Sequence, residues 1–144
     1  MEGNSSLREL SRQHLVDRQQ CGQIMHTIRK KGDKELIRRE ILNFWNTRLR
    51  KHVEAEETVL IPFLAKHHFN NEFINVLVRE HNTIRLLAER IPVHDDGYYL
   101  YRAFINLVEQ HTSFEEEVVF RKMQLDFSPV ELSQLDASIA ARIQ

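Results

Sequence analysis

Helix breakers are scarce in this chain, which has only 4 Gly and 3 Pro among its 144 residues. A fold of many β-strands needs frequent turns, and turns draw heavily on glycine and proline. Between the few breakers, apolar residues recur at spacings of three and four, which is the period of an amphipathic helix. The length suits one domain with a single core. We therefore expect an all-α chain built from a few long helices.

Three clusters of turn residues, at 32–33, 67–71 and 92–97, divide the chain into long helical stretches. Ser128-Pro129, followed by Glu131, marks the start of a short last helix. Short connections favour antiparallel neighbours. We predict an antiparallel up-down-up-down four-helix bundle over about residues 7–125 and a short fifth helix over about 129–142, making one domain of residues 1–144. The expected helices are 5–31, 34–66, 72–90, 98–125 and 129–142.

The apolar stripes of these helices predict which residues enter the core. The stripe of the second helix includes Val59 and Phe63, and that of the fourth includes Val118. Pro62 lies inside the second helix and has no backbone N–H, so we expect a kink or a late break there. Cys21 lies on the core face of the first helix and is expected to be a small buried side chain.

Composition also bounds the compartment and the partners. A single cysteine excludes an intramolecular disulfide and suits a reducing compartment. No signal-peptide pattern opens the chain, and no apolar run approaches the roughly 20 residues of a membrane span. Residues 1–51 are basic, with 12 Lys and Arg against 6 Asp and Glu, but no nucleic-acid-binding motif accompanies them. We expect a cytoplasmic protein with neither a membrane nor a nucleic acid as its partner.

Polar residues interrupt the apolar stripe of each long helix. The pattern His-x-x-x-Glu occurs twice, from His52 to Glu56 and from His111 to Glu115. On a helix these positions lie on one face about 5–6 Å apart, so an imidazole and a carboxylate can reach the same metal ion. The complete inward-facing set, our candidate metal ligands, is His14, His52, Glu56, His81, His111 and Glu115.

The four histidines should lie at one depth in an antiparallel bundle. His14 stands about 18 residues before the first turn, and His52 stands about 20 residues after it. At 1.5 Å per residue, such paired distances differ by about 6 Å at most along the bundle. Ionised glutamates in a core are costly unless they are paired or metal-bound. These donors suit iron, zinc or manganese, and two carboxylates on separate helices can bridge two metal ions.

The ordered motifs resemble those of the hemerythrin-like, or HHE cation-binding, domains over about residues 7–125. The segments that carry the resemblance are Gln13-His14-Leu15, HVEAEE followed by IPF, Glu80-His81-Asn82, and HTSFEEE followed by VF. The resemblance implies a non-haem site of two iron ions joined by an oxo or hydroxo bridge, with Glu56 and Glu115 as bridging carboxylates. It also implies that His14 and His52 serve one iron, with His81 and His111 on the other or in a mixed arrangement.

The chain departs from the oxygen-carrying members of this family at two points. Those proteins have a second histidine one turn after the third-helix histidine, where this chain has Arg85. Their last motif ends in a longer-spaced aspartate, where this chain has Glu115. Four histidines and two bridging carboxylates leave an open position on each metal ion, which favours binding of O2, NO or peroxide. Reversible oxygen transport follows less directly.

Other polar residues near the motifs have less defined roles. Asp17, one turn from His14, can either fill a coordination position or orient a histidine N–H. Glu57 and Glu116 point about 100° away from the candidate ligands, and we expect them to be solvated or to support the ligands indirectly. We expect the remaining histidines at the surface, namely His26, His67, His68 and His94.

The motifs and the family resemblance leave three classes of function: a ligand-binding or sensing protein, an enzyme, and a bundle with a structural metal. The leading hypothesis is a small di-iron protein that binds or senses a diatomic gas or peroxide without being an enzyme. The family resemblance also implies iron–sulfur-cluster repair or a role in nitrosative stress. A di-iron peroxidase or NO-reducing enzyme would need an electron donor, and a third class has a metal that only stabilises the bundle. A sensor would need a protein partner, and the chain itself can be a monomer or a dimer.

Overall fold

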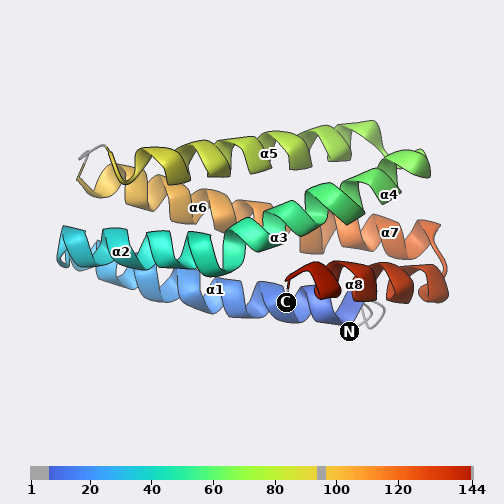
Figure 1. Cartoon of the computed structure of the whole chain (residues 1–144), viewed down its shortest axis with the longest axis horizontal. Coiled ribbons are helices and arrows are strands. Elements are labelled where there is room, and N and C mark those ends of the chain that lie inside the picture. Colours follow the sequence, from blue (N-terminus) through green and yellow to red (C-terminus); the bar gives the residue numbers. More distant parts are fainter. Residues whose placement is uncertain (1–6, 94–96, 144) are drawn as a thin grey trace.

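The computed structural model describes residues 7–93 and 97–143, which form an all-α helical bundle, as predicted. Figure 1 shows long helical rods side by side, with successive rods running in opposite directions. The first rod is α1 and the third is α5. The second rod comprises α2, η2, α3, η3 and α4, and the fourth comprises α6, η4 and α7. The bounds are α1 Arg8–Arg29, α2 Lys34–Phe44, η2 Trp45–Leu49, α3 Arg50–Ala55, η3 Glu56–Leu60, α4 Ile61–Lys66, α5 Asn71–Arg90, α6 Tyr98–Phe114, η4 Glu115–Val119, α7 Phe120–Asp126 and α8 Pro129–Ile143.

Side chains at the turns fix several helix starts. The Asp33 carboxylate accepts a hydrogen bond from the Leu36 N–H at the start of α2, and the Asn70 side chain caps α5. Ser128 and Glu131 bond reciprocally to each other's backbone N–H, at 3.1 and 3.0 Å, at the start of α8. This is the capping arrangement that the sequence predicts there. The predicted start of the first helix before residue 7, and His94, lie outside the described residues.

Three π-helical turns interrupt the second and fourth rods. Each is closed by a hydrogen bond that spans five residues instead of four, so it holds one residue more than an α-helical turn. That extra residue rotates the rest of the rod by about 100° relative to an unbroken α-helix. The closing bonds run from the N–H of Arg50, Ile61 and Phe120 to the carbonyls of Trp45, Glu56 and Glu115 respectively.

The π-helical turns overturn three core predictions. The residues expected on the buried face are only partly buried, namely Val59, Phe63 and Val118. The residue after each of them lies in the core instead, namely Leu60, Leu64 and Val119. Those predictions assumed an unbroken α-helical period. The π turns shift the buried face by one residue relative to that period. The predicted break at Pro62 lies upstream of the proline, in η3, and the chain stays helical through α4.

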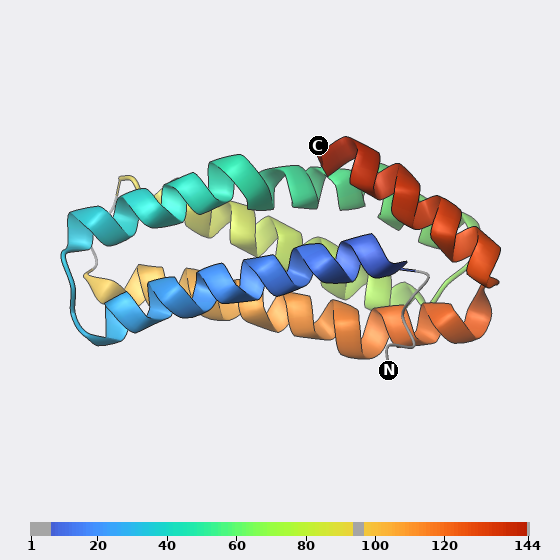
Figure 2. The ribbon, with the colours of Figure 1, turned by 90° about the horizontal axis from the view of Figure 1, so that it is seen from below.

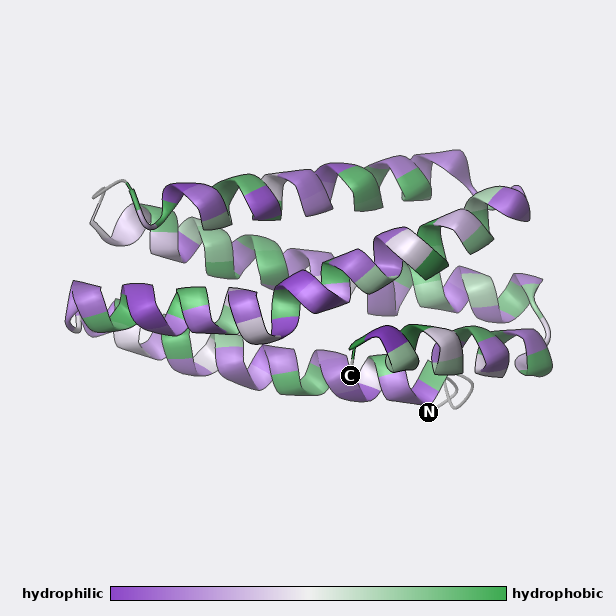
Figure 3. Cartoon of the chain, in the orientation of Figure 1, coloured by the Kyte–Doolittle hydropathy of each residue, from purple (hydrophilic) through white to green (hydrophobic). Residues whose placement is uncertain are grey.

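A polar layer divides the hydrophobic core into two clusters. Along α5, Leu77 belongs to one cluster, Ile84 belongs to the other, and the buried His81 lies between them. Figure 3 shows apolar and polar bands alternating along the rods. Cys21 is buried in the first cluster, as predicted. Each long rod therefore brings polar side chains to the same level between two apolar zones.

The last helix, α8, folds back against α1, α3 and η3 (Figure 2). It buries the three apolar residues that its sequence pattern selects, Leu132, Leu135 and Ile139. Among the described helices, none has both the length and the hydropathy that crossing a membrane requires. Three of the histidines expected at the surface are exposed, namely His26, His67 and His68.

Candidate metal centre

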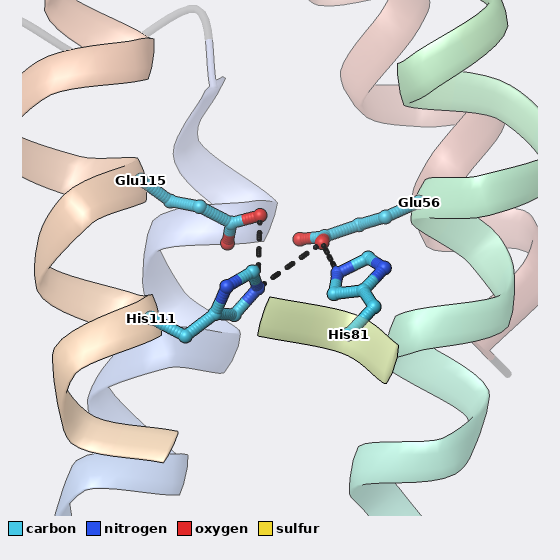
Figure 4. A group of neighbouring side chains, drawn as sticks. All are labelled: Glu56, His81, His111 and Glu115. Atoms are coloured by element: carbon cyan, nitrogen blue, oxygen red, sulfur yellow. Dashed lines mark hydrogen bonds and ion pairs between the residues drawn. The ribbon is translucent and has the colours of Figure 1, made fainter. Parts of the chain in front are cut away.

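The six side chains selected as candidate ligands come together in the polar layer, and all six are buried. They form two overlapping groups in which the potential ligand atoms lie within 4.8 Å of one another. One group contains Glu56, His81, His111 and Glu115, drawn in Figure 4. The other contains His14, His52 and Glu56. Glu56 belongs to both groups.

The Nε2 atoms of all four imidazoles face the two central carboxylates. The distances are 3.0 Å from His14 to Glu115, 3.8 Å from His52 to Glu56, 2.8 Å from His81 to Glu56, and 3.3 and 3.5 Å from His111 to Glu115 and Glu56. Donor atoms from all four rods therefore point at one small volume.

Several of the nitrogen and oxygen atoms that face the centre make no hydrogen bond with any described residue, although other polar atoms lie close to them. They are Nε2 of His52, one oxygen of Glu56 and both oxygens of Glu115. A buried carboxylate without hydrogen bonds is costly, and a cation among these atoms would remove that cost. Imidazole nitrogen and carboxylate oxygen are ligands that iron, zinc and manganese accept. The residues present thus fit a metal centre.

A second set of carboxylates lies beside the outer nitrogen, Nδ1, of each imidazole. The distances are 2.6 Å between His14 and Glu116, 3.1 Å between His81 and Glu57, 2.7 Å between His111 and Glu80, and 3.4 Å between His52 and Asp17. A histidine whose Nδ1–H donates to a carboxylate keeps the Nε2 lone pair free, and metal-binding histidines are oriented in this way. The imidazoles of His14, His81 and His111 are therefore already oriented to bind a metal with Nε2, and His52 has a carboxylate near its Nδ1 without a hydrogen bond.

These contacts bear on three residues whose roles the sequence left open, namely Asp17, Glu57 and Glu116. One oxygen of Asp17 faces the outer nitrogen of His52, and the other accepts from Nε of Arg48 at 2.7 Å. Asp17 therefore lies beside the outer nitrogen of a histidine and is not among the atoms that converge at the centre. Glu57 and Glu116 orient imidazoles of neighbouring rods.

Sequence analysis missed two supporting residues. Glu80 immediately precedes His81, yet its carboxylate holds His111 on the neighbouring rod. Arg48 lies in the π-helical turn η2 and reaches Asp17 on α1. The adjacency of Glu80 and His81 was visible in the motif, whereas no sequence signal indicated Arg48.

The two halves of the centre are built alike. The pairs Glu56-Glu57 and Glu115-Glu116 each open a π-helical turn. The first glutamate of each pair enters the centre. The second holds Nδ1 of a histidine on an adjacent rod, His81 or His14 respectively. Successive helical residues differ in direction by about 100°, which lets one pair serve both tasks.

In the metal-free protein, protons on histidine carry the positive charge of the centre. Burial alone lowers the pKa of His14, but the adjacent carboxylates of Glu115 and Glu116 outweigh burial and raise that pKa to about 10. The pKa of His111 is likewise raised well above its ordinary value, because nearby Glu115 outweighs the effect of burial. Burial raises the pKa of Glu115, but the opposing charge of nearby His111 outweighs burial and holds that pKa well below the usual range. A metal ion would replace these protons.

A cavity of about 20 Å³ lies among the converging atoms, and all of the candidate ligands except His81 line it. Besides polar residues of the centre, its lining contains the apolar side chains of Leu49, Val53, Ile84 and Val108. A single water molecule needs roughly 10–15 Å³ of such space, so the cavity admits only a very small molecule. A larger open groove of about 900 Å³, between the η3–α4 segment and α8, contains none of the six candidate ligands.

Comparison with known proteins agrees with this arrangement. The family model of the hemerythrin HHE cation-binding domain matches residues 5–123. No curated protein and no solved structure matches the chain significantly. The matched range contains all six buried candidate ligands and ends before α8. This chain therefore belongs to the hemerythrin HHE cation-binding family.

Proposed function

We propose that this protein holds two iron ions between its four rods and binds or senses O2, NO or peroxide there. One observation carries the proposal: four imidazole Nε2 atoms converge on two buried carboxylates whose oxygens lack sufficient hydrogen bonds. Membership of a cation-binding family supports a metal at this place. Two carboxylates from separate rods suit a pair of bridged metal ions.

The contacts support a specific division of the ligands. The rings of His14 and His52 stack with centroids 5.2 Å apart, and together with Glu56 they form the first group. His81 and His111 form the second group with Glu56 and Glu115. We assign one iron ion to each pair of histidines, with Glu56 and Glu115 as the bridging carboxylates. Zinc or manganese would be held by the same atoms.

When bound, the iron pair would supply electrons and open coordination positions to a small ligand. The chain's own residues then determine what reaches it. Glu57, Glu80 and Glu116 hold the imidazoles of three histidines in place through Nδ1. The apolar lining of the small cavity favours diatomic gases or peroxide over larger or charged molecules.

Signalling and location belong to the same proposal. As a sensor, the protein would signal through a protein partner. The buried free thiol of Cys21 is compatible with the reducing cytoplasm. Turnover of NO or peroxide would require an external electron donor, and its detection with such a donor would place the protein among the enzymes.

The first test is iron content and the visible spectrum of protein from iron-replete cells. We expect about two iron ions per chain and near-ultraviolet bands that bleach on reduction and change with O2 or NO. Glu56→Gln should abolish loading of the pair, whereas Glu54→Gln, at an exposed position on the same rod, should leave it intact. One zinc ion or no metal would contradict the di-iron proposal. Two iron ions with a spectrum indifferent to every gas and to peroxide would contradict ligand binding.

A further inference from the structure

We propose that Asp136, on the C-terminal helix α8, is a positioning residue that fixes where α1 presents His14 to the metal centre. The consequence for metal binding rests on the proposed function, whereas the contacts themselves do not. Asp136 lies beyond residues 5–123, the range matched by the family model. It therefore belongs to a part of this chain that the family motif does not describe.

Within residues 7–93 and 97–143, helix α1 has no capping side chain of its own. Its N-cap position is occupied by Leu7, which is fully buried and makes no side-chain cap hydrogen bond. The first N–H groups of a helix have no partner within the helix, and a polar N-cap side chain ordinarily accepts from the second or third residue. An apolar, buried N-cap residue leaves that function to another part of the protein.

Asp136 supplies the missing cap from α8. Its two carboxylate oxygens accept the N–H of Glu9 at 3.1 Å and the N–H of Leu10 at 3.0 Å. These are the second and third residues of α1, the donors that a local cap would serve. A negative charge at this end of a helix is also favourable for the helix dipole. One side chain of α8 thus completes the first turn of α1.

The capping carboxylate stands on a firmly held element. Leu132, Leu135 and Ile139 of α8 pack in the same hydrophobic cluster as Leu7 and Leu10 of α1. The start of α8 has its own reciprocal cap, described above. Asp136 therefore fixes α1 relative to an element that follows directly from the fourth rod.

His14 lies one turn beyond the capped residues. Ser11 and His14 both bond the Glu116 carboxylate, at 3.0 and 2.6 Å, so the second turn of α1 is also tied to the fourth rod. On its inner side His14 faces Glu115 at 3.0 Å. Fraying of an uncapped first turn would loosen these contacts. His81 and His111 lie further inside their helices and would be unaffected.

The test compares Asp136→Ala with two controls. Ser128→Ala weakens α8 through its own cap but keeps Asp136, and Asp126→Ala removes an exposed aspartate of α7. Cobalt(II) is titrated into the metal-free protein, and the visible spectrum is recorded at each addition. The titration curve gives the affinity of each of the two bound cobalt ions. Nuclear magnetic resonance reports exchange of the Glu9 and Leu10 amides and of the His14 imidazole N–H. Melting temperature reports overall stability.

We expect Asp136→Ala to accelerate all three exchange rates and to weaken one of the two cobalt ions about 10-fold. Ser128→Ala should lower the melting temperature without this selective loss, and Asp136→Asn should restore part of the affinity because its amide oxygen still accepts. Unchanged exchange of the His14 N–H in Asp136→Ala would overturn the inference, as would equal weakening of both ions. If the wild-type protein binds no metal, the proposed function fails, and the His14 N–H signal still decides the positioning role.

Discussion

The guanidinium of Arg85 donates to one oxygen of Glu57 over 2.9 Å, and the other oxygen of Glu57 lies 3.1 Å from Nδ1 of His81. Arg85 stands one turn after His81, at the position where the oxygen-carrying hemerythrins have a further histidine. An arginine cannot take over ligation there, but it fixes the carboxylate that orients the neighbouring histidine. Arg85 is thus connected to the centre through Glu57 and His81, by hydrogen bonds and not by metal ligation.

Replacing Arg85 should therefore weaken metal binding while sparing the fold. In Arg85→Leu the Glu57 carboxylate loses its second anchor, and we expect metal affinity to fall about 10-fold. The ion pair is about one-third exposed, so the loss of folding free energy should stay below about 1 kcal/mol. Competition with a chelator measures the affinity, and Arg79→Leu, at an exposed position of α5, is the control. Equal affinities in the two variants would contradict the role given to Arg85.

The stability of the metal-free protein should depend on pH in a defined direction. The pKa of His14 rises from 6.5 to about 10 on folding, so its stabilisation is complete below about pH 6.5 and disappears as pH rises through 10. The pKa of Glu115 is lowered from 4.5, so its stabilisation is present above about pH 4.5 and disappears as pH falls through the lowered value. Maximum stability should lie between these limits.

Urea unfolding of metal-free protein from pH 5 to pH 10 measures this dependence. Above about pH 6.5, each histidine with a raised pKa should contribute a loss of at most about 1.4 kcal/mol per pH unit. Glu115→Gln removes the charge that faces both His14 and His111 and should flatten this part of the curve. A free energy of unfolding that increases from pH 7 to pH 10 would exclude this explanation.

The small cavity should control the ligand and not the metal. Val108→Ile adds one methyl group to the apolar lining, and we expect iron content to stay unchanged while affinity for NO or O2 decreases. Gas titration of the reduced protein, alongside iron analysis, separates the two effects. Val78→Ile, on the outer face of α5 at 38% exposure, is the matched control. Unaltered gas affinity in Val108→Ile would place the ligand elsewhere.

Cys21 should be inert in the folded protein. Its side chain is 1% exposed, and burial raises the pKa of its thiol, with a smaller contribution from the charges of Glu109 and Asp17. Reaction needs an accessible thiolate. We expect a thiol reagent to label Cys21 only after denaturation, with a rate that follows unfolding. Rapid labelling of the native protein would show that α1 opens locally near Cys21.

The bundle and the six central residues were predictable because each central residue keeps helical spacing with its near neighbours on the same rod. Scarce breakers and apolar spacing gave the helices, and the same spacing selected His14 and His81 along with apolar neighbours. The burial of Leu60 instead of Val59 was not predictable, because a π-helical turn shifts the phase without a sequence marker. Asp136 was also missed, because its contact with α1 joins residues 127 positions apart and follows no period.

In genetic terms, each π-helical turn of this bundle is equivalent to one inserted codon. Glu56 and Glu115 are the first residues of two such turns, so the segments before and after each of them face the core with different phases. Deleting one codon within 57–60 would remove the extra residue and restore a regular α-helix, with Leu64 still facing the core. Replacing the π-helical turn by an α-helical one without such a deletion would instead turn Leu64 outward in favour of Phe63. These gene segments can therefore lose the inserted codon without changing which side chains after it fill the core.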